Sequence, residues 1–313
     1  RLTILRDGRK VTTAETRSTS VSQMIEHIVG KKARDFSNLT LSRKALGAPI
    51  LELDALQDAH KLRPVSLSIR EGEVVGLAGL LGSGRSSLIK LIAGVDAKAS
   101  GQIRVADQPV DFRGPADAMA QGIAHVPESR ATQGIIGAHA TSDNLTLSIL
   151  DRISVRGLIS KRRVRTLSQK QIDEFDIKVE SHRTPVLNLS GGNQQKVVLG
   201  KNFGIDPKIL LLDEPTAGID IGAKTEIIDA IHSKAGEGMA VIVASSELSE
   251  LAVACDRFLI LADGVICEDV SRDDIVAENP EGADMVPFIQ RVLEEKIQAA
   301  NRTLKTEGFG EKQ

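Results

Sequence analysis

LSGGNQQK at residues 189–196 decides how this chain is interpreted, because two further motifs flank it. GLLGSGRSS lies upstream at residues 79–87, and ILLLDEPTAGID lies downstream at residues 209–220. Alone, Ser-Gly-Gly is a common loop sequence. The order of the three segments is far more specific than any one of them. A Gly-rich loop opens a helix, a second such loop follows, and an apolar strand then ends in two carboxylates. Together these segments predict an α/β fold that binds phosphate groups.

The composition limits the class of protein. The chain has 313 residues, a formal net charge of -2 and 41% hydrophobic residues, enough for an ordinary globular core. This charge indicates no bulk attraction to nucleic acid or anionic lipid. Cys255 and Cys267 have no Cys-x-x-Cys spacing, so we expect two buried thiols rather than a disulfide. The six histidines show no close pairing, and we expect no metal site built by the protein alone.

The loop of residues 79–87 has the context that a phosphate loop requires, because it follows an apolar segment and opens a predicted helix. Its glycines let backbone amides wrap a phosphate, and the helix N-terminus adds partial positive charge. Ser86 is expected to supply a hydroxyl to Mg²⁺. The candidate nucleotide-binding residues here are Gly79, Gly82, Ser83, Gly84, Arg85, Ser86 and Ser87.

The apolar segment 209–212 delivers Asp213 and Glu214 to the carboxyl end of a strand, where sheets of this kind bind ligands. We expect Asp213 to hold Mg²⁺ through water and Glu214 to polarise an attacking water. A pair of acidic helix caps is the simpler alternative. The sequence PTAGID that follows favours the catalytic interpretation.

With these motifs in this order, the chain resembles an ATP-binding-cassette (ABC) domain over about residues 48–280. The resemblance implies an α/β P-loop NTPase fold with a parallel-sheet core, an antiparallel β subdomain and a helical subdomain inserted at about 134–195. It implies ATP and Mg²⁺ as ligands. Residues 281–313 are then a C-terminal helix and tail.

In this family two cassettes face each other head to tail, and the second Gly-rich loop of one serves the ATP on the other. The resemblance therefore implies a second cassette, fused or separate, as a partner. It assigns to the opposite ATP the signature residues Leu189, Ser190, Gly191, Gly192, Asn193 and Gln194.

Several positions depart from the usual ABC pattern. Arg85 replaces the Lys of the phosphate loop, and this exchange is not conservative because Arg is a planar fork of different reach. Glu128 stands where a Gln is usual, and Ser246 stands where a His is usual. The aromatic residue that usually stacks on adenine is missing, because residues 48–72 contain no Phe and the chain has no Tyr or Trp.

This combination resembles the carboxy-terminal cassette of the fused, two-cassette ATPases of bacterial monosaccharide importers. The resemblance implies ATP hydrolysis coupled to transport, with a slow or inactive site on this cassette whose catalytic candidates are Glu214 and Ser246. It places Glu128 at the nucleotide. The implied partners are an integral-membrane sugar permease and, indirectly, a periplasmic sugar-binding protein. The implied location is peripheral, at the cytoplasmic face of the inner membrane.

An internal similarity supports a fused partner. RLTILRDGRKV at residues 1–11 and RFLILADGVIC at residues 257–267 share Arg, Ile, Leu, Asp and Gly in register. Hairpins with an Asp-Gly turn are common, so chance is the alternative. We favour a repeat, in which residues 1–47 are the tail of a preceding cassette and a linker.

Other functions remain open at this stage. A soluble ABC protein acting on translation or DNA repair would carry strong basic tracts and long insertions, and a non-hydrolysing regulatory cassette would carry the same departures as this chain. A nucleoside or a signal sugar is an alternative cargo. The basic stretch 161–165 is interpreted as a solvated helix face rather than a nucleic-acid site, since aromatic residues are only 2% of the chain.

The segment 129–150 is expected to contact the permease, because the resemblance places the groove for the permease's coupling helix there. Ile135, Ile136 and Leu145 are expected at the surface, while packing inside the helical subdomain is an equal alternative for Leu145 and Leu147.

Overall fold

The computed structural model describes residues 1–6, 9–20, 23–24, 27, 45–279 and 285–306. Within these ranges no helix is both long and apolar enough to cross a membrane. The Asp7-Gly8 turn of the internal similarity and most of the expected linker lie outside the described residues.

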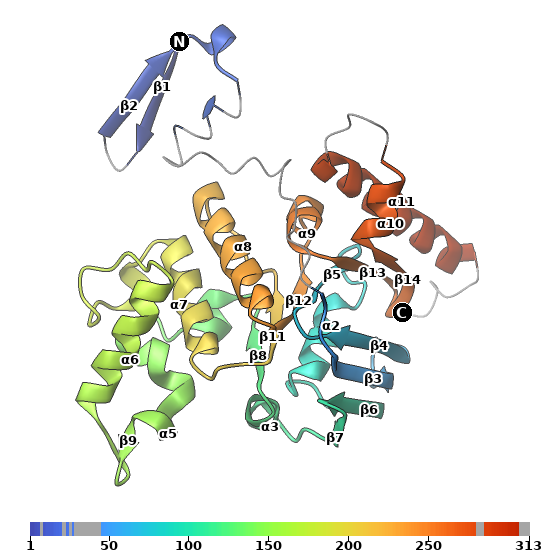
Figure 1. Ribbon diagram of the computed structural model, residues 1–313, viewed down its shortest axis with the longest axis horizontal. Coiled ribbons are helices and arrows are strands. Elements are labelled where there is room, and N and C mark those ends of the chain that lie inside the picture. Colours follow the sequence, from blue (N-terminus) through green and yellow to red (C-terminus); the bar gives the residue numbers. More distant parts are fainter. Residues whose placement is uncertain (7–8, 21–22, 25–26, 28–44, 280–284, 307–313) are drawn as a thin grey trace.

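A six-stranded sheet forms the centre, in the order β14-β13-β5-β12-β11-β8 (Figure 1). Neighbouring strands are parallel except at one edge, where β14 pairs antiparallel with β13. All residues of β5, β11 and β12 are buried, as expected for parallel strands covered on both faces. The strands are β5 (Val74–Ala78), β8 (Ile123–Val126), β11 (Ile209–Asp213), β12 (Ala240–Ala244), β13 (Arg257–Ala262) and β14 (Val265–Ser271).

Alternate residues of these strands enter two apolar cores, because successive side chains of a strand point to opposite faces. Leu210 and Leu212 pack in one core with α7 (Gly191–Phe203), α8 (Ile221–Gly236) and α9 (Leu248–Ala254). Ile209 and Leu211 pack in the other with α2 (Arg85–Ile92) and a second sheet. The central sheet is thus fixed from both sides.

The second sheet is antiparallel, with the order β4-β3-β6-β7. It lies beside α2 in Figure 1. Its strands are β3 (Pro49–Gln57), β4 (Val65–Arg70), β6 (Ser100–Val105) and β7 (Gln108–Val110), followed by α3 (Pro115–Ala120). A separate hairpin, β1 (Leu2–Arg6) and β2 (Arg9–Ala14), begins the chain and is followed by a 3-10 turn at Thr16–Ser18.

A helical lobe lies between β8 and β11 in the sequence. It begins with a π-helical turn at Arg130–Gly134 and ends with α7. Between them lie α4 (Thr141–Thr146), a 3-10 turn (Leu147–Ile149), α5 (Leu150–Ile153), β9 (Ser154–Val155), β10 (Leu158–Ile159), α6 (Lys161–Glu174) and a second 3-10 turn (Val186–Asn188). The small β9–β10 hairpin has no counterpart in the sequence interpretation.

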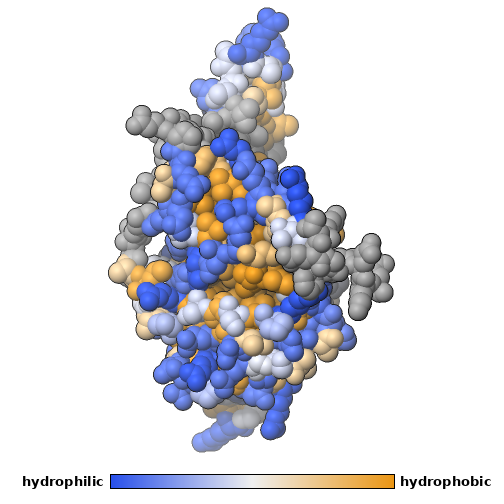
Figure 2. All heavy atoms as spheres, turned by 90° about the vertical axis from the view of Figure 1, so that its right-hand side faces the viewer, coloured by the Kyte–Doolittle hydropathy of each residue, from blue (hydrophilic) through white to orange (hydrophobic). Residues whose placement is uncertain are grey.

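The C-terminal elements are α10 (Arg272–Ala277) and α11 (Met285–Thr306). Phe288, Ile289 and Leu293 of α11 are buried in the same core as α9 and β13. Figure 2 shows the side of the molecule that carries these elements, with apolar atoms gathered in the middle of the face and hydrophilic ones around them. The amphipathic helix expected near the C-terminus is therefore part of the core.

The structure decides two expectations about burial. Leu145 is fully buried among α4, α6 and α7, so of the two placements left open for it the one inside the helical lobe holds, whereas Leu147 is exposed. Cys255 is buried as expected, whereas Cys267 is only half-buried, because it lies on the edge strand β14. A strand at the edge of a sheet has a neighbour on one side only.

Candidate functional site

The phosphate loop connects β5 to α2 and contains positions that only glycine suits. Gly84 precedes α2 with φ 106°, a left-handed conformation that other residues rarely adopt. A Cβ at Gly79 would lie 2.3 Å from the carbonyl oxygen of Leu261. The loop therefore has no side chains at these two positions, and its backbone amides can approach a ligand at the helix N-terminus. Ser83 is buried beside it, and Ser87 is half-buried in the first turn of α2.

Arg85 is directed toward the ends of two neighbouring strands. Its side chain is almost fully buried, and Nη1 donates to the carbonyl oxygen of Ser245, just after β12. Nη2 lies 3.5 Å from Oε1 of Glu214, just after β11. The cation expected at the phosphate loop is thus paired with the candidate catalytic carboxylate.

A second cation, which the sequence analysis missed, lies over the phosphate loop. Nζ of Lys61 is 3.2 Å from the position that a Cβ on Gly82 would take. Asp58 holds this turn, because its Oδ1 accepts from the backbone amides of His60, Lys61 and Leu62 at 2.9, 2.6 and 2.7 Å. Burial alone would raise the pKa of Asp58, but these donors lower it below its usual value. The only signal in the sequence was an Asp followed by a Lys three residues later, which is too common to single out.

Ser86 and Asp213 form a donor set that suits Mg²⁺. The Ser86 hydroxyl donates to Oδ1 of Asp213 at 3.0 Å. Oδ2 of Asp213 is buried and has no hydrogen-bond partner among the described residues. Burial raises the pKa of this carboxyl, the Ser86 hydrogen bond lowers it, and the carboxylates of Glu128 and Glu214 raise it further. A divalent cation with oxygen ligands would relieve this concentration of negative charge.

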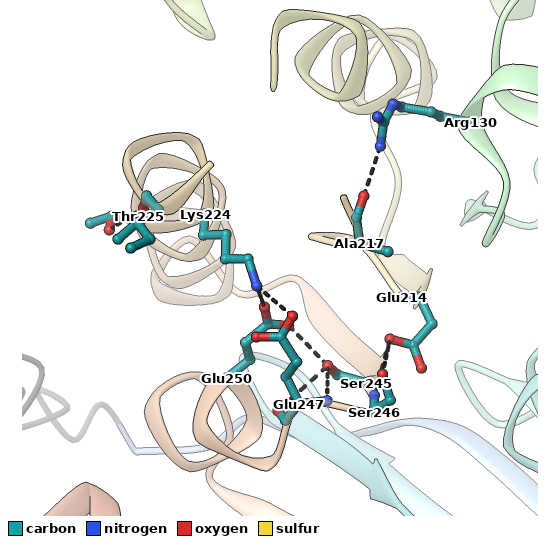
Figure 3. Close-up of polar contacts among 10 residues, drawn as sticks. Arg130, Glu214, Ala217, Lys224, Thr225, Ser245, Ser246, Glu247 and Glu250 are labelled. Carbon is teal, nitrogen blue, oxygen red and sulfur yellow. Dashed lines mark hydrogen bonds and ion pairs between the residues drawn. The ribbon is translucent and has the colours of Figure 1, made fainter. Parts of the chain in front are cut away.

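Glu214 and Ser246 are in direct contact. Oε2 of Glu214 accepts from the backbone amide of Ser246 at 3.0 Å and from its hydroxyl at 3.1 Å (Figure 3). The Glu214 backbone has φ 48°, which is uncommon for a residue with a side chain. Both carboxylate oxygens of the candidate base are therefore engaged, one by Ser246 and the other by Arg85. Glu128 lies nearby and is exposed.

A lysine on α8 holds the segment that presents Ser246. Nζ of Lys224 donates to Glu247 at 2.5 Å and to Glu250 at 2.9 Å, as Figure 3 shows. Glu250 also accepts from the Ser245 hydroxyl at 2.9 Å. Burial would lower the pKa of Lys224, but the two carboxylates raise it above its usual value. This ion-pair network fixes the switch segment, residues 245–250, against α8.

The signature residues begin α7 and lie next to Arg130. The Ser190 side chain caps α7 by accepting from Asn193, both from its backbone amide and from Nδ2. Arg130 donates to the carbonyl oxygen of Ala217 at 2.7 Å (Figure 3) and to that of Gly218 at 3.3 Å. A Cβ on Gly191 would lie 2.9 Å from Nη2 of Arg130. Arg130 thus connects the segment after β8, the loop after Glu214 and the start of the signature helix.

The structure brings most of the expected residues together. The phosphate loop, Asp213, Glu214, Glu128 and Ser246 share the carboxyl edge of the central sheet, which is where parallel sheets bind ligands. The signature residues form a separate group: the Leu189 carbonyl and the Gln194 amide pair with each other, and the Asn193 amide oxygen accepts from the Lys178 backbone. Gly192 packs against Ala223 of α8.

Comparisons with known proteins agree with this geometry. A family described as ABC transporter matches residues 62–217. The ribose import ATP-binding protein RbsA 2 of Rubrobacter xylanophilus is 38% identical over 278 residues, covering 89% of this chain and 53% of that protein. The ribose import ATP-binding protein RbsA of Yersinia pestis is 37% identical over 279 residues, covering 89% and 55%. The chain spans about half the length of these curated relatives.

Solved structures share the fold. A nucleotide-free ATP-binding cassette from an ABC transporter aligns with a TM-score of 0.63 at 20% identity, covering 77% of this chain and 98% of that one. A dimeric ATP-binding cassette in a post-hydrolysis state, bound to ADP and Pi, aligns with a TM-score of 0.62 at 20% identity, covering 71% and 98%. The expected P-loop fold is thereby confirmed. The chain belongs to the ABC transporter family and carries its ATP-binding cassette.

Proposed function

We propose that this chain is the signature-supplying half of an ATP-hydrolysing subunit that powers import of a monosaccharide through an inner-membrane ABC permease. The observation that carries the proposal is the assembled edge of the sheet, where Glu214 contacts both Arg85 and Ser246 beside the phosphate loop. The similarity to ribose import ATP-binding proteins supports the cargo class. A nucleoside or signal-sugar importer is less favoured by these relatives.

The site on this chain is proposed to bind ATP weakly and turn it over slowly. Glu214 is paired with a buried guanidinium, and its other oxygen accepts two hydrogen bonds from Ser246. With both oxygens occupied, neither is free to accept a hydrogen bond from an attacking water, and a general base must be within hydrogen-bond reach of the proton it takes. The competent site would then combine a phosphate loop of another cassette with residues 189–194 of this one. A purely regulatory role for the nucleotide bound here is compatible with this division of labour.

Nucleotide binding would use the groups that the geometry gathers. The loop amides and Lys61 would contact phosphates, and Ser86 and Asp213 would hold Mg²⁺, which would neutralise phosphate charge. Residues 1–47 are proposed to belong to the preceding fused cassette.

The permease is proposed to contact the segment after β8. Ile136 and Leu147 are 42% and 41% exposed, and Leu187 beside the signature is 69% exposed. Large apolar side chains gathered on one lobe commonly mark an interaction surface. Thr141, by contrast, is fully buried and donates to the Thr184 carbonyl, so it offers no contact. A periplasmic sugar-binding protein would be an indirect partner only.

Lys61→Ala should weaken ATP binding by about tenfold, the size expected for loss of one charged contact to phosphate. Adenosine binding should stay within about twofold, because the adenine and ribose do not need this cation. Titration of the purified chain with a fluorescent ATP analogue, with adenosine as competitor, measures both. Lys208→Ala, at an exposed lysine after α7, is the matched control. An equal loss for both ligands would show that Lys61 does not act through phosphate.

In the intact transporter, Ser190→Arg should abolish both ATPase activity and sugar uptake, because it fills the position that faces the opposite γ-phosphate. Glu214→Gln should leave at least about half of the activity, because the site it belongs to contributes little. ATPase and uptake assays on reconstituted transporter measure both. If Glu214→Gln abolishes turnover and Ser190→Arg spares it, the active site is assigned to the wrong pair.

A cysteine at the exposed Ala138 should crosslink to the permease, and Ala138→Glu should uncouple ATPase activity from uptake, because charge there would disturb the docking segment. Ala97, exposed in the loop after α2, is the matched control for both changes and should show neither effect. Normal uptake by Ala138→Glu, without a crosslink from position 138, would remove this segment from the interface.

A further inference from the structure

The β9–β10 hairpin presents aliphatic side chains to solvent. Arg156 and Gly157 form its two-residue turn with φ 52° and 80°, the conformation of a tight type I′ hairpin. Leu158 is 76% exposed, Ile159 58% and Val155 45%. Turns usually carry polar residues, so three exposed aliphatic side chains in one six-residue hairpin indicate a surface that a partner covers.

The hairpin is held firmly in place. The Ser160 amide donates to the Ile153 carbonyl at 2.9 Å, closing the base of the hairpin. Nη1 of Arg163 donates to the carbonyl oxygens of Arg152 and Ser154, which ties the hairpin to α6. Figure 1 shows it at the outer end of the helical lobe, beyond α5 and α6. It is a supported projection and reaches away from the nucleotide site.

Positive charge surrounds these aliphatic residues. Residues 151–170 contain seven Lys or Arg and a single acidic residue, Asp151, although the whole chain has a net charge of -2. Arg156, Lys161, Arg162 and Arg165 are exposed and form no ion pair within the described part of the chain. The charge is therefore concentrated locally and is not neutralised by neighbouring carboxylates.

The placement of this charge opposes the stability of α6. Lys161, Arg162 and Arg163 occupy the first turn of the helix, which contains no acidic residue. Cations at a helix N-terminus are unfavourable, because that end already carries partial positive charge. Arg163 gains two hydrogen bonds to backbone carbonyls in return, whereas Lys161 and Arg162 have no such contact among the described residues and therefore point to a function elsewhere. An anionic surface would offset this loss of helix stability, because it would pair with the cations.

We propose that the β9–β10 hairpin and the first turn of α6 dock on an anionic lipid bilayer, a function beyond the proposed coupling to a permease. Leu158 and Ile159 enter the interface, and Arg156, Lys161, Arg162 and Arg165 contact lipid phosphates. Aliphatic side chains beside a Lys/Arg-rich face are the features that bind membrane interfaces. Each such cation near an anionic surface strengthens binding by about fivefold. The docking would keep the helical lobe in contact with the membrane during the nucleotide cycle.

Other partners fit these observations less well. A single-stranded nucleic acid needs aromatic side chains for stacking, and this projection has none. An acidic protein surface would pair with the cations. It would bury Leu158 and Ile159 only if it also carried an apolar pocket at the matching position.

The test is sedimentation of the 313-residue chain with phosphatidylcholine vesicles that contain about one-third phosphatidylglycerol, at low and high salt. The double variant Arg162→Glu/Arg165→Glu should lower the partition coefficient of the chain onto these vesicles by at least about tenfold. Leu158→Ser/Ile159→Ser should lower it by about tenfold through loss of apolar insertion. Arg70→Glu/Arg113→Glu makes the same charge change at exposed sites outside the helical lobe and should change binding by less than about twofold.

High salt should weaken the binding of the wild-type chain, because exposed charges are screened. No binding to the anionic vesicles, or equal binding to vesicles of phosphatidylcholine alone, would overturn the proposal. Equal effects of the Arg70/Arg113 and Arg162/Arg165 variants would also overturn it, because the attraction would then be nonspecific. Stronger binding to single-stranded RNA than to vesicles would identify a nucleic-acid surface instead. ATP binding by the same variants should be unchanged, so this outcome is separate from the nucleotide site.

Discussion

The buried guanidinium of Arg85 joins the ends of three neighbouring strands. Arg85 begins α2, directly after the loop that follows β5; it donates to Ser245 after β12 and lies beside Glu214 after β11. Parallel strands place all their carboxyl ends at one edge, so a single side chain can reach all three. A buried charge needs a partner, and Glu214 supplies it. The arrangement of the whole nucleotide edge therefore depends on this contact, and so does the availability of Glu214 as a base.

Two further networks extend this edge toward the signature helix. Lys224 fixes the switch segment to α8 through Glu247 and Glu250. Arg130 bonds the loop after Glu214, and the signature begins next to its guanidinium. Lys196 of the signature motif is buried and pairs with Glu226 of α8 at 2.5 Å. Helix α8 therefore contacts both the switch segment and the signature helix.

The sequence predicted the strand that ends at Asp213 and the residues at the edge of the central sheet, because continuous apolar runs and Gly-rich loops are local signals. It did not predict the direction of Arg85, since that depends on Glu214, which lies more than a hundred residues away in the chain. Lys61 was missed because the only local signal, an Asp three residues before a Lys, is too common to single out. The exposed hairpin at Ser154–Ile159 was missed because its strands are too short for a period-two pattern to appear. Two placements stayed open for Leu145 because a helix of six residues has too few turns to define its buried face.

The central claim is that Arg85 and Ser246 hold Glu214 in a state that limits turnover at this chain's own site. Single-turnover hydrolysis of ATP by the purified chain with Mg²⁺, at nucleotide concentrations that saturate binding, tests it most directly. Saturation matters because it separates slow chemistry from weak binding. We expect a rate well below about 1 s⁻¹, the low end of typical enzymes. A rate at or above that value, lost on Glu214→Gln, would contradict the account, because Glu214 would then act as a free catalytic base despite its contacts.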